Sequence, residues 1–126
     1  MKYKELTSII IGLCIKVHQK LGPGLLESVY EAALCYELTK LEMPFSRQQA
    51  IPVKYDEVTL DVGFRADIIV DGKVILELKS IESIAPVHPK ILLTYMKLTK
   101  IEVGLLINFN EVLLKDGITR LISDKE

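Results

Sequence analysis

Apolar residues in this chain follow a helical spacing near its start and a strand-like alternation further on. The helical spacing is clearest in the first element, where the recurring apolar residues are Ile9, Ile10, Leu13, Val17 and Leu21. A Gly22-Pro23-Gly24 run ends that helix. The pattern predicts helices over 5–21, 25–41 and from Pro86 or His88 to 100, and strands over 49–55, 58–64 running on to 70, 74–79 and 102–107.

The end of the chain reads as a last hairpin, in which 112–114 pairs with 118–122 after a turn at 108–110. The predicted order is two helices, three strands, one helix and three strands. No repeat or linker interrupts it, so we expect a single domain, 1–126, of the α/β (α+β) class with a mixed central sheet flanked by helices.

Three charged residues, Asp67, Glu77 and Lys79, interrupt two otherwise apolar strands. Such residues are rarely buried unless they are paired or bind a metal. A two-residue turn at 71–72 would mix charged and apolar residues on both faces of the hairpin. A three-residue loop of 70–72, with Gly72 left-handed, instead places the charged residues on one face and leaves the other apolar. One face then carries Arg65, Asp67, Ile69, Ile75, Glu77 and Lys79, and the other carries Phe64, Ala66, Ile68, Val70, Val74, Leu76 and Leu78.

This register places Asp67 diagonally across the hairpin from Glu77, close enough for the two carboxylates to share a divalent cation. A surface hairpin with one charged face in water accounts for the same spacing, because antiparallel sheets often have a solvated face. Spacing alone leaves both interpretations open.

Glu27 is the next charged residue in an apolar setting. Projected as a helix, it shares a stripe with apolar residues further along, namely Tyr30, Leu34, Leu38 and Leu41. If Gly24 is the N-cap, Glu27 is the third helical residue and its carboxylate satisfies backbone N–H groups there. The alternative is that Glu27 joins Asp67 and Glu77 at a site.

Composition narrows the class of protein. The chain has 126 residues, 49% of them hydrophobic, and no apolar run near the roughly 20 residues of a membrane span. It begins without a signal-peptide pattern, so we expect a cytoplasmic protein, with Cys14 and Cys35 as buried thiols in helices. With 16 basic and 17 acidic residues the net charge is −1, which argues against a strong nucleic-acid binder but does not exclude a local basic patch.

Five blocks of this sequence, in order, resemble the landmarks of one protein family. The first is the Gly-x-x-Glu-x-x-Tyr pattern of 24–30, and the second is Arg65-Ala66-Asp67 followed by Glu77-Leu78-Lys79. The runs 93–99, 104–110 and 117–120 complete the set. The chain thus resembles the GxxExxY proteins, which look like a compact branch of the PD-(D/E)XK nuclease superfamily. That resemblance implies a restriction-endonuclease-like αβββαβ core, here with an extra N-terminal helix and a C-terminal hairpin.

The resemblance also implies roles for individual residues. Asp67 and Glu77 would bind Mg²⁺ or Mn²⁺, helped by the Leu78 backbone carbonyl, and Glu27 would act through a water or a second ion. Lys79 would position the attacking water or stabilise developing charge. A salt bridge to Asp67 or Glu77 is its alternative role.

Further residues are candidates for contact with substrate: Arg65, Tyr30, Tyr95, Lys90 and Lys97. Each has a structural alternative, since Arg65 could pair with Glu77 across the hairpin, the tyrosines could fill the core, and the lysines could line a solvated helix face. One departure from the family pattern is Ile91, which stands where most members carry a glutamine.

Two functions therefore remain open. The first is a Mg²⁺-dependent nuclease that hydrolyses phosphodiesters in DNA or RNA, with Glu27, Asp67, Glu77 and Lys79 as catalytic residues. The second is a catalytically relaxed module that keeps the fold for protein interaction or assembly, which the near-neutral charge and Ile91 favour. We expect no membrane partner, and the resemblance is compatible with a homodimer.

Overall fold

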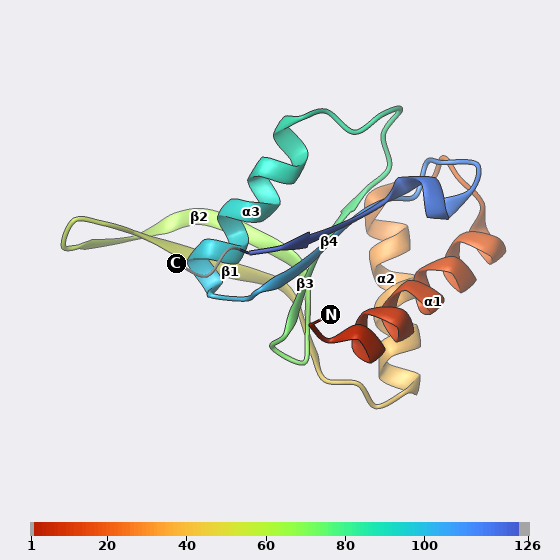
Figure 1. Ribbon diagram of the computed structural model, residues 1–126, viewed down its shortest axis with the longest axis horizontal. Helices are drawn as coiled ribbons and strands as arrows, with labels where there is room; N and C mark the ends of the chain where they lie inside the picture. Colours follow the sequence, from red (N-terminus) through yellow and green to blue (C-terminus); the bar gives the residue numbers. More distant parts are fainter. Residues whose placement is uncertain (1, 124–126) are drawn as a thin grey trace.

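The chain folds around one five-stranded sheet with helices on both faces (Figure 1). The computed structural model describes residues 2–123. The helices are α1 (Lys4–Leu21), α2 (Glu27–Lys40), α3 (Val87–Thr99) and a short 3₁₀ helix, η1 (Leu114–Gly117). The strands are β1 (Phe45–Tyr55), β2 (Val58–Val70), β3 (Val74–Lys79), β4 (Val103–Asn108) and β5 (Ile118–Ile122).

The strands follow one another across the sheet in chain order, and β3 with β4 is the parallel pair. That pair needs a crossover connection, which α3 provides. α1 and α2 cover one face of the sheet and α3 covers the other, each over its own apolar core (Figure 1). The predicted α+β class, mixed sheet and αβββαβ order are thus confirmed. Cys14 and Cys35 are buried free thiols, and no helix in 2–123 is long and apolar enough to cross a bilayer.

The β2–β3 loop contains three residues, as predicted, but it begins one residue later. Val70 pairs with Val74, so the loop is 71–73 and not 70–72. Asp71 and Gly72 both have positive φ, 53° and 63°. This shift of the loop does not by itself move any side chain to the other face. It does place Asp67 directly opposite Glu77 and not diagonal to it.

β1 and β2 twist sharply at Gln48, which lies opposite Asp67 in the register. Gln48 has a left-handed backbone, with φ 51°, in the middle of a strand. Beyond this point the ribbon turns over: Ala66 packs in the α3-side core, and the Phe64 ring lies 4.9 Å from that of Tyr95 on α3. The prediction that Phe64 and Ala66 share a face with Ile68 is therefore wrong, because a regular alternation assumes a regular strand.

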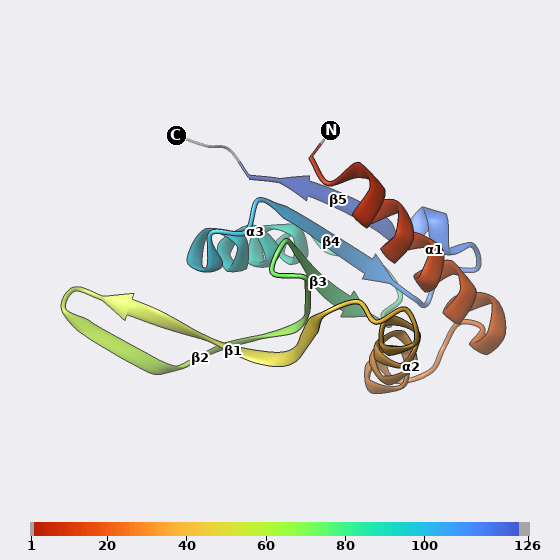
Figure 2. The ribbon, with the colours of Figure 1, turned by 90° about the horizontal axis from the view of Figure 1, so that it is seen from below.

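Past the twist, β1 and β2 leave the sheet as a projecting ribbon (Figure 2). The register shifts between Ile51 and Val53, next to Gly63. A Cβ on Gly63 would come within 2.5 Å of the Ile51 carbonyl oxygen, so this close approach requires glycine. Tyr55 and Val58 near the tip are 68% and 57% exposed.

The last strand pairs differently from the prediction. Ile118–Ile122 (β5) runs antiparallel beside β4, while the predicted partner strand, 112–114, is absent and its place is taken by a bend leading into η1. The neighbouring strand offers a longer ladder than a three-residue segment can, so β5 closes a hairpin with β4.

A candidate metal centre where the sheet divides

Asp67 and Glu77 face each other at the point where the sheet divides. β2 pairs with β1 along its length but with β3 from Ile68 to Val70, while the end of β3 continues beside β4. We call this point the fork and define it by Asp67 and Glu77. Side chains replace the strand ladder here: the Asp67 N–H donates to Glu77 Oε1 at 3.4 Å, and the Leu78 N–H donates to Asp67 Oδ2 at 2.8 Å.

Burial makes both carboxylates of the fork hard to ionise. Glu77 is 6% exposed, and burial followed by the nearby Asp67 carboxylate raises its pKa to about 8. Burial also raises the pKa of Asp67, against the hydrogen bond from the Leu78 N–H. Within residues 2–123 neither carboxylate forms an ion pair. A buried acid and a half-buried acid therefore lie together without a direct ion pair to either.

Glu27 reaches the fork from α2. The helix begins at Glu27, two residues later than predicted, and Leu26 is the N-cap residue without a side-chain hydrogen bond, so the predicted capping role of Glu27 is wrong. Its Oε2 instead accepts a hydrogen bond from the Ser80 N–H at 3.4 Å, just past β3. The Glu27 charge helps to raise the pKa of Glu77, which places the three carboxylates in one electrostatic unit.

Tyr30 explains where α2 begins. Its hydroxyl donates to the Gly22 carbonyl at 2.6 Å and accepts from the Leu25 N–H at 3.1 Å, and its ring stacks on Phe109 at 4.4 Å. These contacts hold the 22–25 loop outside the helix. Tyr30 is fully buried, so the expected contact with substrate is replaced by a role in placing Glu27.

Lys79 lies at the fork as predicted. It is partly exposed, and its charge lowers the pKa values of both Asp67 and Glu77. The alternative of a salt bridge to either acid is not what the fold shows, since Lys79 forms no ion pair among the described residues. An ammonium beside two carboxylates, but not bound to them, is free to meet an anionic substrate.

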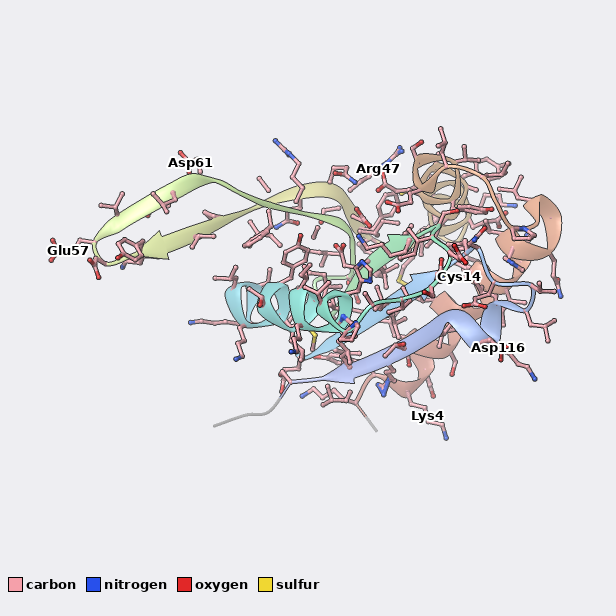
Figure 3. All side chains as sticks on the ribbon, turned by 90° about the horizontal axis from the view of Figure 1, so that it is seen from above. Lys4, Cys14, Arg47, Glu57, Asp61 and Asp116 are labelled. Atoms are coloured by element: carbon pink, nitrogen blue, oxygen red, sulfur yellow. The ribbon has the colours of Figure 1, made fainter. Side chains whose placement is uncertain are left out.

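The sequence reasoning missed three residues beside the fork. Glu31, one turn after Glu27 on α2, is 6% exposed and accepts from Arg47 Nε and Gln48 Nε2, both at 2.6 Å. Gln48 Nε2 also donates to Asp67 Oδ1 at 3.2 Å. Figure 3 shows Arg47 beside α2. A pocket of about 360 Å³ opens here, lined by Glu27, Ser28, Glu31, Gln48, Asp67 and Leu78.

The remaining candidates lie around the fork at different distances from its chemistry. Arg65 is exposed and donates to the Gln48 carbonyl at 3.0 Å, so the expected pairing with Glu77 is wrong. Tyr95 is buried on α3, and after burial the carboxylates of Glu77 and Asp67 raise its pKa, which places its hydroxyl near them.

The outer face of α3 carries the two candidate lysines. Lys90 and Lys97 are both exposed there, on the side away from the sheet. Ile91 packs against the α3-side core. A hydrocarbon side chain at that position gives α3 a packing contact in place of an amide.

The carboxylate oxygens at the fork match a hard divalent cation in chemistry and in charge, because Mg²⁺ prefers such oxygens and neither Asp67 nor Glu77 forms an ion pair among the described residues. Each of the three carboxylates already accepts a hydrogen bond from a backbone N–H group: Glu77 from Asp67, Asp67 from Leu78 and Glu27 from Ser80. Within the described part of the chain no three His, Cys, Asp or Glu side chains are placed to hold an ion. A carboxylate oxygen that accepts one N–H group keeps a second lone pair for a cation, so Asp67 can bind an ion in the orientation that its hydrogen bonds hold, and the other carboxylates would close on that ion.

Comparison with known proteins agrees with this fold. A family model described as PD-(D/E)XK nuclease superfamily matches residues 4–121, so the chain belongs to that superfamily. Nucleases of this superfamily typically use divalent metals, and nucleic acid is the substrate class that membership suggests. No curated protein and no solved structure matches the chain.

Proposed function

We propose that this protein is a divalent-cation-dependent nuclease of the GxxExxY kind that hydrolyses phosphodiesters in DNA or RNA. The observation that carries the proposal is that the buried Glu77 faces the half-buried Asp67 at the fork, with no ion pair to either carboxylate among the described residues. Glu27 and Lys79 join them from α2 and from the end of β3. This combination of acids and a lysine is suited to hold a cation next to a phosphate.

Asp67 and Glu77 would hold Mg²⁺ or Mn²⁺ directly, with the Leu78 carbonyl as a further oxygen and Glu27 through a water or a second ion. The bound cation would polarise the phosphate and lower the pKa of an attacking water. Glu27, the exposed acid of the set, would accept a proton from the attacking water. The Lys79 ammonium would stabilise negative charge as it develops on the phosphate.

Substrate would approach over basic side chains near the fork and on the outer face of α3. Arg65 is exposed next to Gln48, and Lys90 and Lys97 are exposed on the outer face of α3. Each can contact a backbone phosphate, which adds affinity without sequence preference. The net charge of −1 fits a protein whose nucleic-acid contacts are local and whose site charge is offset by the cation.

Titration calorimetry with Mg²⁺ and Mn²⁺, together with a cleavage screen on single-stranded, duplex and branched DNA and RNA, tests the proposal. The wild-type chain is expected to bind a cation and to cut at least one substrate. Asp67→Asn and Glu77→Gln are expected to lose both properties. Asp71→Asn is a matched control, because Asp71 is an acid of the same hairpin that pairs with Lys73 away from the fork.

A wild-type chain that binds neither cation and cuts nothing would refute the nuclease proposal. One observation favours a second function in that case. The projecting ribbon of β1 and β2 exposes Tyr55, Val58 and Leu60, an apolar surface suited to protein contact. An interaction module would use this surface and would be unaffected by changes at the fork. The expected homodimer is a separate prediction, which sedimentation velocity of the full chain tests.

A further inference from the structure

Gln48 has an unusual backbone conformation at a functionally important place. Its φ of 51° is in the left-handed region, which a glutamine in the middle of a strand adopts at a cost. Such strain persists only where surrounding contacts hold it, and it gathers at functional sites. In the register Gln48 lies opposite Asp67, between the pairs Arg47–Ile68 and Gln49–Ala66.

The side chain of Gln48 bridges two acids. Its Nε2 donates to Glu31 Oε1 at 2.6 Å and to Asp67 Oδ1 at 3.2 Å, so both amide hydrogens are used. Its backbone carbonyl accepts from Arg65 at 3.0 Å. The left-handed turn thus coincides with a set of contacts directed at the fork.

Glu31 is a fixed point for this bridge. It is 6% exposed, and its second oxygen, Oε2, accepts from Arg47 Nε at 2.6 Å. A carboxylate held at both oxygens cannot turn freely, so it holds the Gln48 amide in place. Asp67 is held in the same way, by Gln48 at Oδ1 and by the Leu78 N–H at Oδ2.

We propose that Gln48 is a positioning residue of the metal centre, and that Glu31, through Gln48, sets the orientation of the Asp67 carboxylate. The inference rests on the proposed function in that the cation is the ligand of Asp67. Residues that orient a metal ligand typically contribute about 10- to 100-fold to metal affinity. Glu31 and Gln48 act through Asp67 and are not catalytic residues.

A purely structural role is the alternative, in which Gln48 only ties β1 to α2. The backbone conformation separates the two roles. Glycine adopts a positive φ readily, so Gln48→Gly removes the side chain and relieves the strain at once. The variant is expected to fold with unchanged or higher thermal stability, whereas a structural tie would show its loss as a lower melting temperature.

Two measurements on the full chain test the proposal. The first is the χ1 rotamer of Asp67 in cation-free protein, from three-bond couplings of its side-chain carboxyl carbon. We expect one rotamer in the wild type and rotamer averaging in Gln48→Gly. The second is calorimetric Mg²⁺ and Mn²⁺ affinity, which we expect to be about tenfold weaker in Gln48→Gly. Gln49→Ala is the matched control, because the Gln49 side chain accepts from Ser46 and not from the fork.

A single Asp67 rotamer in Gln48→Gly, equal to that of the wild type, would overturn the proposal, and so would unchanged cation affinity. Averaging that appears equally in Gln49→Ala would also overturn it. A wild-type chain that binds no cation but shows the expected rotamer change in Gln48→Gly would refute the proposed function and leave the positioning of Asp67 by Gln48 intact.

Discussion

The backbone N–H of Asp67 donates to the side chain of Glu77 across the fork, at 3.4 Å. The two strands are thus joined by an acid at the point where their regular pairing ends. This contact brings Glu77 into a buried position beside a second carboxylate. The free energy of unfolding and the proposed cleavage chemistry both depend on what compensates those two charges.

Stability without cation should fall as the pH rises. The pKa of Glu77 is about 8 in the folded chain against an ordinary value of 4.5, so between these values the folded state holds a proton that the unfolded state has lost. The free energy of unfolding should decrease by up to about 1.4 kcal/mol per pH unit across that window and level off above it. Urea unfolding in EDTA at pH 5.5 and 8.5 measures the change.

Glu77→Gln should remove most of this pH dependence, because a neutral side chain has no proton to lose. Asp67, whose pKa is also raised, leaves a smaller decrease with the same sign. Glu82→Gln, at an exposed position, is the control and should keep the wild-type slope. An unchanged slope in Glu77→Gln would show that the buried acid is not the source.

Two buried glutamates of α2 offer a matched comparison. Glu31 is bound by Arg47 and Gln48, and Glu37 by Lys16 and Lys40. Changing either to alanine should lower the free energy of unfolding, since each loses charge-assisted hydrogen bonds whose basic partners can still reach water.

Cation affinity should separate the two variants. Glu31→Ala frees the Gln48 amide and should weaken Mg²⁺ binding about tenfold, whereas Glu37→Ala lies away from the fork and should not change it. Calorimetric titration of both variants with Mg²⁺ measures the two affinities. Equal affinities would mean that Glu31 does no more than stabilise the helix.

Lys79→Met should separate cleavage from cation binding. The substitution keeps a long side chain and removes the ammonium that faces developing charge on the phosphate, so the cleavage rate should fall by about 10²- to 10³-fold. Cation affinity should stay within about threefold, because Lys79 is not a ligand. Lys73→Met, in the β2–β3 loop, is the control and should cut at the wild-type rate. A loss of cation binding in Lys79→Met would contradict its assigned role.

Tyr30→Phe should lower the free energy of unfolding by about 1–2 kcal/mol. The phenylalanine keeps the stack on Phe109 but leaves the Gly22 carbonyl and the Leu25 N–H without their partner. Tyr36→Phe, at an exposed position of the same helix, should change stability by less than about 0.5 kcal/mol. Chemical denaturation of both variants measures the difference, and equal stabilities would show that the loop is held by other contacts.

Periodicity was enough to predict most of the fold. Apart from the predicted strand 112–114, which does not form, the helices and strands lie within a few residues of their predicted bounds, because a buried stripe or face repeats with the geometry of the backbone. The position of the β2–β3 loop was missed by one residue, since loops at 70–72 and 71–73 give the same parity of side chains. Val74 also pairs with Val103 on β4, which is far from it in the sequence. The spacing of residues within the hairpin gives no information on that pairing.

Part of the candidate site was also predicted, because some of its residues stand out in the local sequence pattern and others do not. Asp67, Glu77 and Lys79 stood out because charged residues conflict with an apolar strand. Glu31 did not, because a glutamate on a helix is ordinary until its surroundings are known. Its partners come from β1, and no local pattern brings a strand residue to a helix 16 or 17 positions earlier.

By itself, the sequence determined the order of elements, the shared parity of Asp67 and Glu77, and the family resemblance, all of which depend on local periodicity and motif spacing. Only the tertiary structure decided that these acids meet at a fork in the sheet, that Tyr30 is buried under the start of α2, and that Gln48 adopts a left-handed backbone. Gln48 has no intrinsic preference for that conformation. Contacts between distant segments select it, and such contacts exist only after the chain has folded.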